Sequence, residues 1–152
     1  MKDKTIAVYR FLSKEEFDSW IKNDKEKISF PYKEDGLVNC NNHSYRENVK
    51  FVHFFKNLSD AHTVCLSMKE DIQHLCKFEI AKKILTHFEG KGKYYDDNLC
   101  VTDVVEYAIP LELIDTNCLK EFRIVKDTNE AKYIRDNQGW EKICDLDAFE
   151  KF

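Results

Sequence analysis

The chain has 152 residues, of which 43% are hydrophobic and 34% are charged, and its formal net charge is −4. This length and composition predict one globular domain over residues 1–152 and exclude a disordered or linker-rich protein. No dense Lys/Arg block marks a nucleic-acid-binding surface, and no apolar run approaches the roughly 20 residues of a membrane span. We therefore expect a cytoplasmic protein that does not enter the membrane.

The six cysteines are widely and irregularly spaced, and no CxxC pair occurs. Without a signal-peptide pattern at the N-terminus, this usage predicts reduced thiols packed as small hydrophobic side chains. A structural zinc site needs four convergent ligands. The nearest pair, His74 and Cys76, offers two, so we predict no metal.

The first predicted strand covers residues 6–10, where β-branched and aromatic side chains gather. A helix follows and reaches about residue 23, because Ser13 is a good N-cap and Glu16 three residues later completes a capping box. Residues 24–47 are polar and irregular. A loop of that length in a compact domain is usually functional or mobile.

An aromatic strand is predicted at residues 49–55, and a helix begins at Leu58. Residues 72–80 alternate between apolar and polar side chains, which indicates a half-buried strand. Residues 81–88 predict a helix that ends at the Gly-Lys-Gly sequence after it.

In the last third, residues 94–98 predict an exposed aromatic loop and residues 101–109 a strong strand ending at a proline. A further strand is expected at residues 122–125, and helices at 129–135 and 140–152. Strands and helices that alternate without regular βαβ spacing favour an α+β fold over a doubly wound sheet.

Three strand positions carry polar groups suited to chemistry. Arg10 follows Tyr9 in the first strand, His53 lies among aromatic residues, and Glu106 interrupts an otherwise apolar strand. A carboxylate in such a strand must face solvent, a cation or a cleft. A structural interpretation is open for each of them: a solvated or salt-bridged arginine, a satisfied core histidine, and a solvent-facing glutamate.

The sequences VYRFLSKEEFDSWI, VKFVHFFKNLSDAHTV and VVEYAIPLELI, in this order, resemble the ADP-ribosyltransferase superfamily, especially its small bacterial and phage toxin-like members. The resemblance spans roughly residues 9–125. It implies two small packed β-sheets flanked by helices, NAD as the substrate without a metal, and a macromolecular acceptor, protein or nucleic acid, in toxin or phage–host conflict.

The resemblance also implies a site. The catalytic residue would be Glu106, placed against the ribose to stabilise the cation that forms when nicotinamide leaves. The residues expected to bind NAD are Tyr9, Arg10, His53, Phe55, Tyr94 and Tyr95. Among them, Arg10 would clamp the pyrophosphate or hold the adenosine ribose, and His53 would bind a ribose hydroxyl. Tyr94, Tyr95 or Phe55 would stack on nicotinamide.

The chain departs from the family pattern in two places. His53-Phe54-Phe55 stands where arginine-type members have a Ser-Thr-Ser motif, and Ala108 stands where a second glutamate marks arginine-modifying members. Two alternative functions therefore stay open. One is a metal-independent ribonuclease-type toxin that uses the same side chains as acid, base and phosphate clamp. The other is a non-enzymatic inhibitor or adaptor on the same scaffold.

Overall fold

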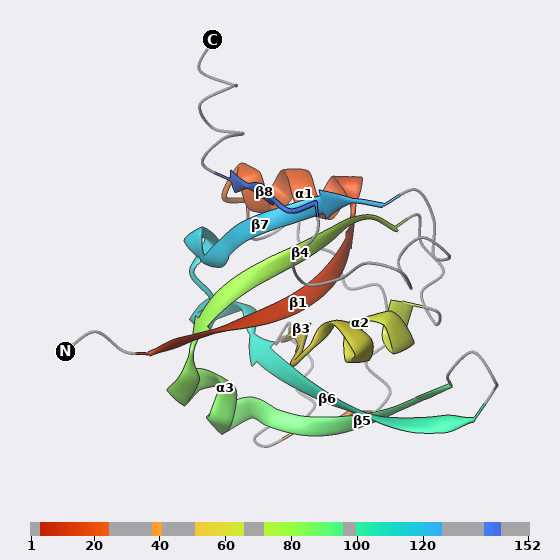
Figure 1. Ribbon diagram of the computed structural model, residues 1–152. Coiled ribbons are helices and arrows are strands. Elements are labelled where there is room, and N and C mark those ends of the chain that lie inside the picture. The colour runs from red at the N-terminus through yellow and green to blue at the C-terminus, as the bar shows by residue number, and fades with distance from the viewer. Residues whose placement is uncertain are drawn as a thin grey trace, which may run out of the picture.

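The strands in the described part of the chain join into one antiparallel, eight-stranded sheet in an α+β domain (Figure 1). The computed structural model describes residues 4–24, 38–40, 51–65, 72–95, 100–125 and 139–143. The strands are β1 Thr5–Ser13, β2 Val38–Cys40, β3 Phe51–Phe55, β4 Ile72–Ala81, β5 Glu89–Tyr95, β6 Val101–Pro110, β7 Leu119–Ile124 and β8 Glu141–Lys142. The helices are α1 Lys14–Ile21, α2 Leu58–Cys65 and α3 Lys82–Phe88, with 3-10 turns at Leu111–Leu113 and Thr116–Cys118.

The order of the strands is β2-β5-β6-β3-β1-β4-β7-β8, so β1 and β3 stand at the centre. The expectation of two separate packed sheets is wrong, because β1 pairs with both β3 and β4 and so joins the two halves. The joint is narrow. The β1–β4 ladder runs from Thr5 to Ser13, whereas the β1–β3 register consists of Tyr9 opposite Phe55.

Each face of the sheet carries its own hydrophobic cluster. On one face, which we call the α1 face, Val8, Val52 and Phe54 pack against Trp20 of α1 and Phe88 of α3. The opposite face, the α2 face, carries a smaller cluster beneath α2 that consists of Tyr9, Phe11, Phe55, Ala61, Leu75, Tyr94, Val104 and Val125. Both faces are therefore buried at the centre of the sheet, which is typical of strands that are apolar at successive positions.

Helix α1 starts as predicted, because the Ser13 hydroxyl accepts a hydrogen bond from the Glu16 amide at 3.2 Å. The Glu16 side chain does not complete a capping box. Its carboxylate turns inward to Arg10 and Trp20 instead. Strands β1, β3, β4, β6 and β7 and helices α2 and α3 confirm the predicted segments, with their ends shifted by a few residues.

Three predictions fail on the described residues. Residues 38–40 form β2 within the stretch expected to be a loop, and residues 94 and 95 belong to β5 rather than to an exposed loop. Residues 141 and 142 form β8 where a helix was expected. In each case, pairing with a neighbouring strand overrides the local preference of the sequence. The helix predicted at 129–135 lies outside the described residues, as does most of the loop at 24–47.

None of the described helices is long and apolar enough to cross a membrane. The described residues also contain no group of three or more His, Cys, Asp or Glu side chains placed to hold a metal ion. Cys76 is a buried free thiol, and burial raises the pKa of Cys76 well above its usual range.

His74 lies on the α1 face as a buried imidazole. Its ring stacks on Phe17 with centroids 4.1 Å apart, and its Nδ1 has no hydrogen-bond partner among the described residues. Burial lowers the pKa of His74; the charge of Lys14 acts in the same direction and that of Asp18 against it. Because the folded state disfavours the imidazolium, this histidine supports folding above its unfolded pKa of about 6.5 and costs stability as the pH falls.

We therefore expect His74→Phe to stabilise the protein more at pH 5 than at pH 8. The substitution removes a buried group that must otherwise stay neutral and unpartnered, which costs about 1–3 kcal/mol. Thermal unfolding at the two pH values measures the effect, with the exposed His87→Gln as the control. An equal shift at both pH values would contradict this explanation.

Candidate functional site

Glu106 is the centre of a buried polar cluster on the α2 face. Its side chain is fully buried, and the Tyr94 hydroxyl donates to both carboxylate oxygens, at 2.9 and 3.1 Å. His53 Nδ1 lies 3.3 Å from the Oε2 atom of Glu106 and donates to it when it carries the proton. Burying a carboxylate is costly unless donors compensate it, and these two side chains supply that compensation.

Three neighbouring strands bring this cluster together. Glu106 belongs to β6, His53 to β3 on one side of it and Tyr94 to β5 on the other. Side chains alternate between the faces along a strand. Because Val52 and Phe54 point to the α1 face, the His53 ring points to the α2 face, where it meets Glu106.

Gly92 in β5 gives the Glu106 carboxylate its space. A Cβ atom at this position would overlap Oε1 of Glu106 and lie 2.6 Å from Cε2 of Tyr94. Contacts this short do not occur between real side chains, so the carboxylate and the phenol occupy the volume that any larger residue would fill. The glycine expected only to end a helix is therefore part of the site.

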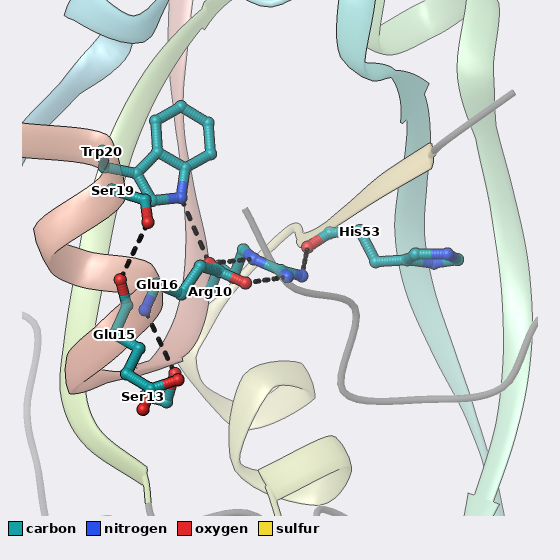
Figure 2. A network of polar contacts seen from close by, with 7 residues as sticks. All are labelled: Arg10, Ser13, Glu15, Glu16, Ser19, Trp20 and His53. Carbon is teal, nitrogen blue, oxygen red and sulfur yellow. Dashed lines mark hydrogen bonds and ion pairs between the residues drawn. The ribbon is translucent and has the colours of Figure 1, made fainter. Parts of the chain in front are cut away.

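Arg10 lies on the opposite face of the sheet (Figure 2). Its guanidinium is fully buried and forms a bidentate ion pair with Glu16 of α1, with Nη2 to Oε1 at 2.6 Å and Nε to Oε2 at 3.0 Å. The Trp20 indole also donates to Oε2, at 3.1 Å. A buried bidentate pair of this kind holds α1 against β1.

The two polar groups meet at His53. Arg10 Nη1 donates to the His53 carbonyl at 2.9 Å, while the imidazole of the same residue contacts Glu106 on the other face. Figure 2 shows the carbonyl of His53 turned toward Arg10 and its ring directed away from it. Arg10 thus crosses the narrow joint between β1 and β3 and fixes the main chain beneath the Glu106 cluster.

Tyr9 and Phe55 share a row with Glu106 on the α2 face. The register pairs run Glu106–Phe55, Phe55–Tyr9 and Tyr9–Lys77 across four strands. Phe55 is fully buried in the cluster under α2, whereas Tyr9 retains 7% exposure. Lys77 stands at the end of this row, where its Nζ lies 4.5 Å from the ring centre of Trp140 and 3.4 Å from Glu121 Oε2.

The structure therefore brings together Glu106, His53, Tyr94, Phe55 and Tyr9 of the predicted site, and it separates Arg10 from them. The Tyr95 side chain lies outside what the structure describes. Sequence reasoning missed Gly92 and Lys77, since neither belongs to a pattern with a recognisable chemical role. Glu16 was noticed as a capping residue, but its partnership with Arg10 depends on the fold.

An open groove of about 740 Å³ lies away from this cluster, beside the end of α1 and the outer strands β7 and β8. Its lining includes Trp20, Asn23, Asn117 and Lys142, and none of the Glu106 cluster. Its charges are mixed, because Glu79, Lys120, Glu121 and Lys142 all line it.

No family model, curated protein or solved structure matches this chain.

We expect Gly92→Ala to destabilise the protein by about 1–3 kcal/mol, as overpacking does in a filled site. The loss should shrink in the double variant with Glu106→Ala, which removes the atoms that the new methyl group would meet. Urea unfolding of the two single variants and the double variant gives their coupling, and the exposed Lys91→Ala in the same strand is the control. Additive losses would show that Glu106 does not occupy this space.

A second prediction concerns the ion pair. Arg10→Met and Glu16→Gln should each cost about 3–5 kcal/mol, because each leaves one buried charge without its partner or its full attraction. The double variant leaves no charge, and the amide oxygen that replaces the carboxylate can still accept from the Trp20 indole. It should therefore be more stable than either single variant. If denaturant unfolding finds the double variant to be the least stable of the three, the pair is not the buried unit described above.

Proposed function

We propose that the protein is an NAD-dependent mono-ADP-ribosyltransferase that modifies a protein or a nucleic acid, with Glu106 as its catalytic carboxylate. The observation that carries the proposal is the fully buried Glu106 held by Tyr94 and His53. The sequence VVEYAIPLELI, which places this glutamate in β6, supports it through the resemblance to that superfamily. A role in toxicity or phage–host conflict belongs to the same proposal.

A buried carboxylate suits this reaction. When the bond between nicotinamide and ribose breaks, positive charge develops on the ribose, and a fixed negative group in a site of low dielectric stabilises that charge strongly. In the proposed complex, the ribose 2′-hydroxyl takes the place of the Tyr94 hydroxyl at one Glu106 oxygen. His53 keeps the other oxygen oriented toward the ribose.

The positions of Arg10 and Lys77 in the structure assign Arg10 a different role from the one expected from the sequence. Its guanidinium is engaged by Glu16 and by the His53 carbonyl and has no exposed surface, so in this proposal it positions the site instead of clamping pyrophosphate. Lys77 lies on the Glu106 face, three strands away, or roughly 14 Å at about 4.8 Å per strand. An extended dinucleotide can span that separation, with Tyr9 between its ends and Lys77 near its phosphates.

The test is release of nicotinamide from NAD by the purified protein. We expect Glu106→Gln to lower the rate by about 10²–10³-fold, the loss typical of removing one electrostatic contact to a transition state. Glu112→Gln, which changes an exposed glutamate just after β6, should retain the wild-type rate. Full activity of the Glu106 variant would exclude the assigned carboxylate, and an inactive wild-type protein would exclude the transferase.

A metal-independent ribonuclease is the second candidate, and the contact between His53 and Glu106 favours it. A histidine beside a carboxylate is a common acid–base arrangement, and Tyr94 could supply a further proton donor. This alternative predicts RNA cleavage in the presence of a chelator and without NAD, which His53→Ala would abolish. A protein that binds neither NAD nor RNA but co-purifies with a partner would point to the non-enzymatic inhibitor or adaptor.

A further inference from the structure

Asp60 places a second carboxyl group beside Glu106. It lies in the first turn of α2, which begins just after β3, and its side chain accepts a hydrogen bond from the Val105 amide. The Lys56 amide donates to the Val105 carbonyl at 3.3 Å, which ties the start of this segment to the same residue. Since Val105 directly precedes Glu106 in β6, the Asp60 carboxyl group is held next to the strand position that carries Glu106.

The start of α2 fixes Asp60 in place. Asn57 accepts hydrogen bonds through its Oδ1 atom from the Asp60 amide at 2.9 Å and from the Ser59 hydroxyl at 2.8 Å. The next residue, Ala61, is fully buried in the cluster of the α2 face. The main chain of Asp60 is therefore fixed at the start of α2, by the Asn57 side chain and by the packing of Ala61 on the sheet.

Asp60 is the most accessible acid of this group. Glu106 is fully buried, and His53 and Tyr94 are 5% and 9% exposed, whereas Asp60 is only half-buried. Burial raises the pKa of Asp60; the Val105 hydrogen bond and Lys56 oppose this rise, and the nearby charge of Glu106 adds to it. A carboxylate that is more basic than usual and can be reached from outside suits proton removal.

We propose that Asp60 is the general base for the transfer step, in which it takes the proton of the attacking nucleophile. The inference rests on the proposed transferase function. In this step the bond between ribose C1′ and nicotinamide breaks, and nicotinamide leaves with the bonding pair as a neutral molecule. A lone pair of the acceptor oxygen forms the new bond to C1′, and the acceptor proton passes to Asp60 and then to water. Glu106 stabilises the ribosyl cation between the two events.

Glu106 and Asp60 have different tasks in this proposal, because they differ in exposure. Glu106, which is buried, acts on the ribose and is needed whichever nucleophile attacks. Asp60, at the accessible side, acts on the nucleophile and is needed only when that nucleophile has a proton to lose. The acceptor class implied is therefore a protonated, neutral group such as a hydroxyl.

Small nucleophiles test this division directly. NAD is incubated with the protein in water, in water with methanol and in water with sodium azide, and the ADP-ribose products are separated. Asp60→Asn retains an acceptor for the Val105 amide, so the helix start should persist. We expect this variant to lose about 10²-fold or more in hydrolysis and methanolysis. Its rate with azide, an anion with no proton to remove, should match the wild type within about threefold.

Two variants complete the experiment. Asp103→Asn, at an exposed position of β6, should match the wild type with every nucleophile, and Glu106→Gln should stay inactive even with azide. Unchanged methanolysis in Asp60→Asn, or a loss that azide does not restore, would overturn the role of Asp60 while the transferase proposal stands. A wild-type protein that cleaves no NAD under any condition would overturn both.

Discussion

The buried ion pair between Arg10 and Glu16 is the interaction on which the centre of this fold depends. Strands β1 and β3 share one register pair, so the two halves of the sheet have few main-chain contacts where they meet. The guanidinium strengthens this joint by binding a helix through Glu16 and the adjacent strand through the His53 carbonyl. Removing either partner alone should lower the stability strongly, because the remaining charge would be buried without a counter-charge.

The same joint links the two faces of the sheet. His53 presents its carbonyl to Arg10 on one side and its imidazole to Glu106 on the other. A group that is structural on the α1 face therefore helps to set the geometry of the polar cluster on the α2 face. Because they lie on opposite faces of the sheet, the two charged strand residues Arg10 and Glu106 can both be fully buried and still have different partners.

Much of the secondary structure could be predicted from local patterns, whereas the pairing of residues in space could not. The periodicity of residues 72–80 and the capping position of Ser13 indicate β4 and α1 correctly. Strand β5 has the sequence EGKGKYY, whose glycines and lysines are poor strand formers, and it forms because β2 and β6 flank it. Its Tyr94 therefore becomes a buried partner of Glu106 instead of a loop residue.

The face of the sheet on which Arg10 lies could also not be predicted from the local sequence. Its neighbours in β1 are apolar at successive positions, so alternation does not distinguish one face from the other, and only the register with β3 and β4 does. Glu106, His53 and Phe55 were named together from the sequence, and the structure places them on neighbouring strands β6 and β3. The space that Gly92 leaves for Glu106 and the hydrogen bond between Asp60 and Val105 could be found only from the positions of their neighbours, because a glycine in a strand and an aspartate at a helix start have common structural explanations.

The most direct measurement is a calorimetric titration of NAD into the wild-type protein and into the Arg10→Met/Glu16→Gln double variant. Because the proposed dinucleotide site lies on the Glu106 face and Arg10 is buried on the other face, both proteins should bind NAD saturably, with dissociation constants within about tenfold of each other. No binding to the wild type at millimolar NAD would contradict the proposed function. Binding that is lost only in the folded double variant would contradict the structural role of Arg10 and return it to the dinucleotide site.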